Sequence, residues 1–171
     1  MRNLNHYFKQ YQLLTDWYLS VLEGIKEEDG NKTVDGKGNS LEWLAGHLII
    51  GRYRNMLRLG IQLDPPETLD LFINQSIPPP NAIAFNTNTK YPTLHACIEQ
   101  WKVYAKIFPA NLNSLDEGIL QNEMPFSVAS GGNTVEDALI FVVLHESFHI
   151  GQMSIIRKHL GYPAMQLTLK K

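Results

Sequence analysis

The sequence predicts an all-α fold, a four-helix bundle with a long crossover between the second and third helices. Three observations lead to this prediction. Four long segments carry apolar residues at the three- and four-residue spacing of a helix face. Stretches rich in glycine, proline and asparagine separate them, and one of these is far longer than a turn. Two of the segments are also preceded by residues typical of helix caps.

The first two helices are predicted from apolar spacing and from the signals that end or begin them. We expect the first helix to span about residues 4–28, with Leu14, Tyr18 and Val21 on its apolar face. The glycine-containing segment 29–38 then breaks it. Asn39 is expected to cap the second helix, with Glu42 completing a capping box, and the helix should continue to about Ile61.

The third and fourth helices follow a proline-rich connection. Residues 62–90 contain five prolines, so we expect a long crossover with a short helix around 68–72. The third helix should begin near Pro92, which suits a first helical turn, and continue until Pro109 disturbs it.

Helix four follows a loop over residues 122–132, which could contain a short extended pair. Asn133 and Glu136 are expected to form the capping box that opens this helix. Gly161 and Pro163 are expected to close it.

Length and composition favour one domain over residues 1–171. A chain of this length with 44% hydrophobic residues can bury a full core but is short for two domains. Its formal net charge of −2, with scattered lysines and arginines, provides no broad basic surface for a nucleic-acid backbone. We therefore expect no nucleic-acid partner.

Targeting signals and cysteine usage favour a cytoplasmic protein. The first residues lack the apolar core of a signal peptide, and the longest apolar run, Ala138–Leu144, is far shorter than a membrane span. No membrane partner is expected. The single cysteine, Cys97, rules out an internal disulfide and fits a reducing compartment.

The strongest chemical signal is a pair of histidines one helical turn apart. His145 and His149 stand in an otherwise apolar stretch, and on a helix both rings can reach one small volume. With Glu146 they spell His-Glu-x-x-His, the zincin signature, in which two histidines bind zinc and the glutamate activates water. On its own, this motif predicts a metalloprotease.

The third ligand that a catalytic zinc site needs does not follow the motif. No Asp or Glu occurs after residue 149, and His159 would lie about 15 Å from His149 along a continuing helix. His47 is the best upstream candidate, because it lies with Leu44 and Leu48 on a helix face that should be buried. Both predicted inward stripes are polar at their centres, which suggests one shared site.

At these residues the chain resembles the DinB-like superfamily of metal-binding four-helix bundles, also called YfiT-like. The resemblance rests on His47 within Trp-Leu-x-Gly-His-Leu, and on His-x-x-x-His-x-Gly-Gln at 145–152 followed by Leu-Gly-Tyr-Pro. It implies a divalent metal held by His47, His145 and His149, often in a homodimer. Family members include transferases and isomerases that depend on low-molecular-weight thiols, and members without an assigned reaction.

The resemblance and the ligand set together predict a metal-dependent enzyme. Three imidazoles leave a position open on the metal, as in catalytic sites, and zinc is our first expectation and nickel the second. By analogy, the enzyme would act on a small-molecule substrate, either as a thiol S-transferase with a low-molecular-weight thiol as cosubstrate or as a related hydrolase. The alternative is a bundle that keeps the metal for stability or sensing, without turnover.

Two residues beside the ligand pair have open roles. Glu146 could act as a base near the metal, or it could face another helix or solvent. Gln152 could hydrogen-bond a metal-bound water or a ligand ring, or it could join two helices. Arg54 and Arg157 could contact the carboxylates of a small thiol, but we expect surface charges. His6, His95 and His159 are expected at the surface or its boundary.

Overall fold

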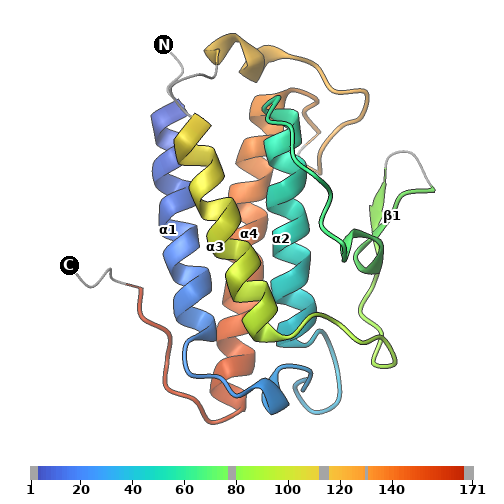
Figure 1. Ribbon diagram of the computed structural model, residues 1–171, viewed down its shortest axis with the longest axis vertical. Coiled ribbons are helices and arrows are strands. Elements are labelled where there is room, and N and C mark those ends of the chain that lie inside the picture. The colour runs from blue at the N-terminus through green and yellow to red at the C-terminus, as the bar shows by residue number, and fades with distance from the viewer. Residues whose placement is uncertain (1–3, 77–79, 112–115, 130, 168–171) are drawn as a thin grey trace.

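Four long helices form the protein, which confirms the predicted all-α bundle. The computed structural model describes residues 4–76, 80–111, 116–129 and 131–167. The helices are α1 (Leu4–Leu22), α2 (Leu41–Arg58), α3 (Leu94–Asn111) and α4 (Val135–His159), as Figure 1 shows. Each helix packs mainly on two others, so that α1 and α2 both contact α3 and α4.

The crossover decides the topology of the bundle. α1 and α4 run in one direction, and α2 and α3 run in the other (Figure 1). The chain must therefore return from one end of the bundle to the other between α2 and α3. This segment contains the short helix η2 (Leu69–Leu71), as predicted, and an antiparallel pair of strands, β1 (Ile73–Asn74) and β2 (Asn81–Ala82).

Two helix starts lie one residue later than predicted. Ser40, not Asn39, caps α2 and accepts a hydrogen bond from the Trp43 amide. At α4 the capping box consists of Thr134 and Asp137. The predicted pair included Asn133, whose carbonyl instead accepts the Met124 amide in an extended segment, where Glu123 and Thr134 form an isolated bridge. The short extended pair expected within residues 122–132 is therefore reduced to a single bridge, and its second residue lies beyond that loop.

Two helix ends also differ from prediction. α1 ends at Leu22, well before residue 28, because Gly24 takes a positive φ of 73° that a helix cannot continue. The residues that follow form the short helix η1 (Glu27–Asp29), and the Glu27 carboxylate accepts the backbone amides of Leu94 and His95 at the start of α3. α2 ends at Arg58, three residues before the predicted Ile61.

The end of α3 and the end of α4 show how proline and glycine act differently. α3 continues past Pro109 to Asn111, since a proline in the last turn removes only one helical hydrogen bond. α4 ends as predicted, because Gly161 adopts a φ of 86° and the Tyr162 amide bonds back to the Arg157 carbonyl. After α3, the short helix η4 (Glu117–Gln121) precedes the loop that leads to α4.

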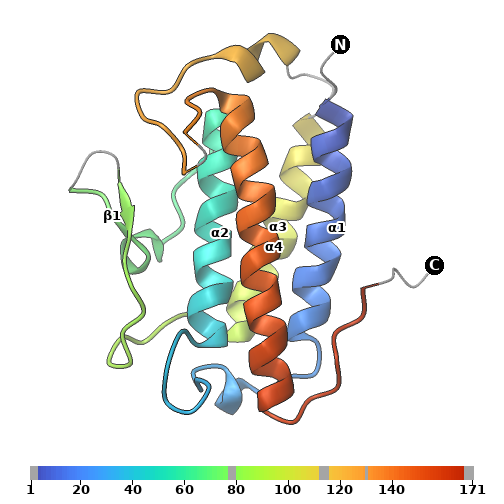
Figure 2. The same cartoon turned by 180° about the vertical axis from the view of Figure 1, so that it is seen from behind.

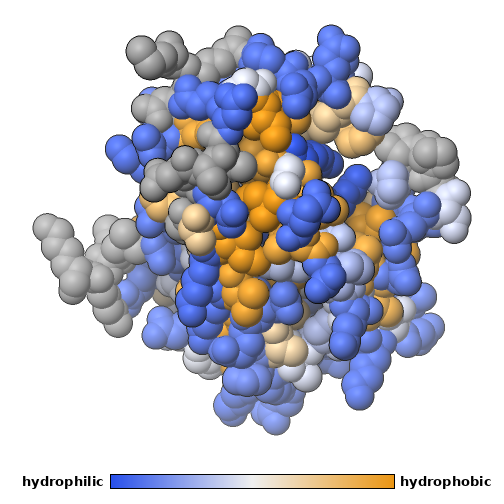
Figure 3. Space-filling view, turned by 45° about the horizontal axis from the view of Figure 1, so that its top comes forward, coloured by the Kyte–Doolittle hydropathy of each residue, from blue (hydrophilic) through white to orange (hydrophobic). Residues whose placement is uncertain are grey.

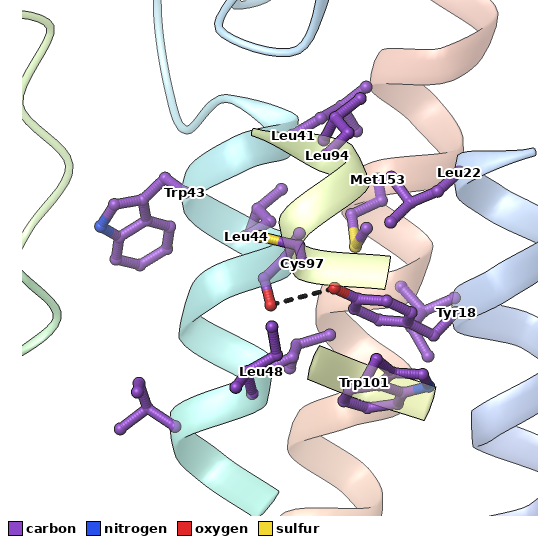
Figure 4. Packing of buried hydrophobic residues seen from close by; sticks show 14 of the residues in the cluster. Tyr18, Leu22, Leu41, Trp43, Leu44, Leu48, Leu94, Cys97, Trp101 and Met153 are labelled. Atoms are coloured by element: carbon purple, nitrogen blue, oxygen red, sulfur yellow. Dashed lines mark hydrogen bonds between the residues drawn. The ribbon is translucent and has the colours of Figure 1, made fainter. Parts of the chain in front are cut away.

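Aromatic packing joins α1, α2 and α3 at the centre of the bundle. Tyr18 stacks on Trp101 with ring centroids 3.9 Å apart and planes 14° apart. Its hydroxyl donates to the Ala45 carbonyl at 3.3 Å, as Figure 4 shows. On the other side of this stack, the Arg52 guanidinium lies 3.7 Å from the Trp101 ring. A buried cation therefore belongs to the core of this protein.

α4 is apolar on more than its core side. It is long and apolar enough to cross a membrane by length and composition, and one third of the tested window is buried. The longest uninterrupted apolar run, Ala138–Leu144, did not reveal that the mean hydropathy is so high over a membrane-length stretch of the helix. Since the core helix of a soluble bundle passes the same test, the finding alone is weak.

The opposite side of the bundle carries the crossover and a pocket. On the face formed by α3 and the crossover, apolar side chains gather in the middle and polar ones surround them (Figure 3). A pocket of about 510 Å³ lies between α2, α3 and residues 63–68, with Cys97 and Tyr104 in its wall. None of the three histidines singled out from the sequence lines it.

Gly46 allows the crossover to approach α2. A Cβ atom at this position would lie 2.1 Å from the Phe72 ring, which is fully buried. We expect Gly46→Ala to lower the free energy of unfolding by about 1 to 3 kcal/mol, the usual cost of overpacking.

Gly51→Ala on the same helix is the matched control for that measurement by urea unfolding. A Cβ at Gly51 meets nothing within 4 Å, so this change should stabilise the protein by up to about 1 kcal/mol through helix propensity. Equal effects of the two changes would contradict close packing at Gly46.

Candidate metal centre

Three histidine rings meet between α2 and α4. α2 contributes His47, and α4 contributes His145 and His149, one turn apart. The His145 Nε2 lies 3.1 Å from the His47 Nε2 and 3.0 Å from the His149 Nε2. All three candidate ligand atoms lie within 4.8 Å of one another. Thus the structure brings together the three histidines that the resemblance implied.

The three nitrogens fit a divalent cation better than they fit one another. A neutral imidazole has one N–H and one lone pair, so the His145 Nε2 cannot bond well to two other ring nitrogens. Metal–nitrogen bonds of about 2.0 to 2.1 Å imply nitrogens roughly 3 Å apart around one ion. The observed separations match that value. In the described part of the chain no Asp, Glu or Cys joins the cluster.

Burial keeps these rings neutral, as metal ligands must be. It lowers the pKa of His47 to about 3, helped by the positive charge that His145, His149 and Arg54 would place nearby. Burial and the neighbouring His149 lower the pKa of His145 to about 4. The pKa of His149 is also lowered by burial. At neutral pH all three rings therefore offer lone pairs.

Gln152 orients one of the ligand rings. Its Oε1 lies 2.7 Å from the His149 Nδ1, one turn further along α4. Because an amide oxygen can only accept, the proton of the neutral ring is on Nδ1, and the Nε2 lone pair faces the other two rings. Of the two roles left open by the sequence, the structure places Gln152 on a ligand ring.

Aromatic side chains surround the three rings. Trp43 stacks on His47, with centroids 4.7 Å apart and planes 8° apart. In Figure 4 it points away from the side of α2 that faces Tyr18. Phe141 lies 5.5 Å from the His145 ring, and Phe148 lies 5.4 Å from the His149 ring. Trp43 and Phe141 make the surroundings of the rings less polar, whereas Phe148 is 64% exposed.

Glu146 points into the core, where Arg52 binds it. The Arg52 Nε and Nη2 donate to its two carboxylate oxygens at 3.0 and 2.9 Å, and both side chains are almost fully buried. Burial raises the pKa of Glu146 and the guanidinium opposes this rise. A carboxylate held by two charge-assisted bonds is an ionised partner of Arg52. Its position gives no support to the zincin role of a water-activating glutamate.

Arg52 is a residue that the sequence reasoning missed. Besides Glu146 it bonds to the Thr15 hydroxyl at 2.6 Å and the Tyr11 carbonyl at 3.1 Å, both on α1. A signal was present, because Arg52 stands one turn after Leu48 and one turn before Met56 on the apolar face of α2. An arginine in such a stripe requires a buried partner.

The two arginines considered as substrate contacts have different positions. Arg157 is buried, not a surface charge, and binds the carbonyls of Val21, Glu23 and Pro163. It therefore holds the end of α1 and the segment after α4. Arg54 is half-buried on the same face of α2 as His47, and burial lowers its pKa. Among the described residues Arg54 has no hydrogen-bond or ion-pair partner.

The remaining histidines lie where the sequence predicted. His6 and His95 are exposed near the starts of α1 and α3. His159 is exposed at the end of α4, with its Nε2 3.7 Å from the Asp35 carboxylate. None of them approaches the histidine cluster.

The buried pair between α2 and α4 makes a prediction about stability. Arg52→Met should lower the free energy of unfolding by about 3 to 5 kcal/mol, because the Glu146 charge would remain buried without a partner. Urea unfolding of metal-free protein measures this effect. The double variant Arg52→Met with Glu146→Leu should recover most of the loss. A single variant as stable as the parent would show that the pair does not hold the helices together.

The ring orientation set by Gln152 makes a prediction about metal affinity. Gln152→Leu should weaken zinc binding by about 10- to 100-fold, since His149 would lose its hydrogen-bond acceptor. Competition with a chromophoric chelator measures the affinity. Ser154→Ala on the same helix should leave it unchanged. If both variants bind zinc like the parent, Gln152 does not orient a ligand.

Comparison with known proteins agrees with the fold. The sequence pattern of the DinB superfamily matches residues 10–153. Among solved structures, YfiT from Bacillus subtilis superposes with a TM-score of 0.62 at 14% identity, over 95% of this chain and 92% of that one. YfiT is described as a probable metal-dependent hydrolase with an unusual four-helix bundle topology. No curated protein matches. From the family match over most of its length, this chain belongs to the DinB superfamily.

Proposed function

We propose that this protein is a metal-dependent enzyme that acts on a small electrophilic molecule, with a low-molecular-weight thiol as the first choice of nucleophile. The observation that carries the proposal is the meeting of three neutral imidazoles from two helices, with no fourth ligand among the described residues. Three ligands leave an open position, as in catalytic metal sites, whereas closed structural sites have four.

The bound cation would be zinc or, as second choice, nickel. Imidazole suits both metals, and the separations of the ring nitrogens match bonds of the usual length to zinc. A divalent ion supplies Lewis acidity and lowers the pKa of a thiol or water that it binds.

The protein's own residues hold and shield the reaction site. His47, His145 and His149 would hold the cation, and Gln152 would keep the His149 ring in the productive orientation. The nearest acidic residue in the sequence, Glu146, is occupied by Arg52 and offers no general base. This supports a thiol over water, because a thiol pKa of about 8.5 needs less help to reach the anionic form.

Hydrolysis is the second candidate, and a specific observation favours it. YfiT, which shares the fold, is described as a probable metal-dependent hydrolase. The same three-histidine arrangement could serve water as well as a thiol. We place either reaction in the cytoplasm, on a small molecule and not on nucleic acid or membrane. This placement follows from the charge pattern and the single buried cysteine.

The position of Arg54 supports the proposal that the substrate or thiol carries an anionic group. Its charge lies close enough to His47 to lower the pKa of that ring. A half-buried guanidinium without a counter-charge in the described structure is a ready contact for a carboxylate. We therefore propose that Arg54 binds a carboxylate of the thiol.

The activity test uses the purified full chain loaded with zinc or with nickel. We expect it to speed the consumption of a carboxylate-bearing thiol by monochlorobimane, followed by fluorescence. His149→Ala should abolish this rate, because two histidines hold the metal poorly.

Ser154→Ala is the control, since it changes α4 without touching the cluster. Hydrolysis of activated esters without thiol consumption would favour the second candidate. Metal-dependent thermal stability with neither activity would favour a structural or sensing role, and it would overturn the proposed enzyme.

The substrate-charge test compares two thiols. Arg54→Gln should raise the KM for a carboxylate-bearing thiol by roughly 10-fold, in keeping with about 1.5 to 3 kcal/mol for a charged hydrogen bond that is partly replaced by solvent. The KM for an uncharged thiol should stay unchanged. Equal changes for both thiols would contradict a charge contact by Arg54.

A further inference from the structure

Two arginines near the end of α2 carry positive charges that no acidic residue of the described structure balances. Arg54 and Arg58 stand one helical turn apart, and both are half-buried. Neither forms an ion pair with a described Asp or Glu. The two other described arginines differ, since Arg52 binds Glu146 and Arg157 binds three backbone carbonyls. A half-buried pair of like charges is costly without an anion nearby.

The two arginines continue the face of α2 that carries His47. At 100° per residue, positions 47, 54 and 58 lie within about 40° of one another around the helix axis. Along the axis, Arg54 and Arg58 follow His47 by roughly 10 and 16 Å. Long side chains on a helix lean toward its N-terminus, which here is the direction of the histidine cluster. The Arg58 Nη1 follows this rule and donates to the Asn55 Oδ1 at 2.6 Å.

Gly51 leaves space along this face. It stands between His47 and Arg54 in α2, and an added Cβ there would meet nothing within 4 Å. By contrast, a Cβ at Gly46 on the same helix would collide with the Phe72 ring. A molecule bound at the histidine cluster can therefore extend past Gly51 toward the two arginines.

Neighbouring side chains hold Arg58 in place. Its partner Asn55 donates to the Tyr11 hydroxyl at 2.5 Å, and its guanidinium carbon lies 5.8 Å from the centre of the Phe126 ring. Phe126 belongs to the segment between η4 and α4, which lies beside the end of α2 in Figure 2. Burial and the charge of Arg54 lower the pKa of Arg58 to about 10, so it is still charged at neutral pH. Its remaining N–H groups meet no protein acceptor among the described residues.

We infer that Arg54 and Arg58 together bind a doubly charged anionic group of the small molecule that reacts at the metal. This inference rests on the proposed function and extends the single carboxylate proposed for Arg54. Side chains one turn apart on a helix have Cβ atoms about 5 to 6 Å apart. Two guanidiniums at this spacing can share one phosphate group, or each can bind one end of a dicarboxylate. A singly charged group would leave one of the two charges without a partner.

The same geometry gives the shape of the molecule. The open position on the metal lies at His47, whereas the two arginines begin two and three turns further along α2. The reactive atom and the doubly charged group must therefore lie at opposite ends of an elongated molecule. Because the charges at the far end are both positive, an uncharged or cationic end is excluded from this position.

The test measures anion binding by isothermal titration calorimetry at constant ionic strength. It uses the full chain in zinc-loaded and in metal-free form, because zinc itself can bind anions. We expect phosphate or succinate to bind at least about tenfold more tightly than acetate in both forms, since a second charged hydrogen bond is gained. Arg58→Gln should remove this preference, and so should Arg54→Gln. Lys158→Gln removes one exposed positive charge at the other end of the bundle and should keep it.

The outcomes separate the sources of the double charge and the two proposals. A preference for phosphate alone identifies a phosphate ester, and a preference for succinate alone identifies a dicarboxylate. Acetate that binds as tightly as both, or a preference that survives Arg58→Gln in a variant whose urea unfolding matches the parent, would overturn the inference. Because calorimetry needs no turnover, a protein with the preference but without thiol or hydrolase activity would refute only the proposed enzyme.

Discussion

The buried pair of Arg52 and Glu146 is the interaction on which the rest of the structure depends. It fixes α2 against α4 at the level of the histidine cluster, since Glu146 is the residue next to His145. Arg52 also binds α1 through Thr15 and Tyr11 and lies over Trp101 of α3. One guanidinium therefore contacts all three neighbouring helices. Its burial would be costly unless every one of these contacts were present.

This arrangement gives the His-Glu-x-x-His sequence of α4 a structural reading that differs from that of a zincin. On a helix, Glu146 lies about 100° around the axis from His145. In this bundle Glu146 therefore faces the core, where Arg52 binds it, while the two histidines face α2. The residues of this motif therefore have two different structural roles. Its histidines turn toward His47, and its glutamate holds the helices that carry them.

α4 has three working faces. One packs in the core with the residues around Glu146, one presents His145 and His149 to α2, and one leaves Leu144, Phe148 and Ile155 exposed. A helix used on all sides has little amphipathic contrast, which explains why its composition alone resembles a membrane span. Phe148 lies at the border between two of these faces, against the His149 ring.

The crossover sets the relative direction of the helices and so brings the two parts of the histidine cluster together. Because the chain returns along the outside between α2 and α3, α2 and α4 can lie antiparallel as neighbours. His47 then meets two residues about a hundred positions later. Phe72 packs this crossover against Gly46, the residue directly before His47. The position of that histidine is thus supported from the outer side of α2 as well as from the core.

The sequence by itself determined the bundle, the crossover, the closing glycine of α4 and the His145–His149 pair, because apolar spacing and ligand spacing are local patterns. His47, which is far away in the chain, was reached through its predicted buried face and through the family resemblance. The sequence reasoning misplaced the caps at Asn39 and Asn133, since neighbouring Ser40 and Thr134 offer equivalent caps and only long-range pairing selects between them. Tertiary structure decided the partner of Glu146, the burial of Arg157 and the exposure of Leu144, Phe148 and Ile155 on α4. Each depends on which helix lies beside which, and the spacing along one chain does not contain that information.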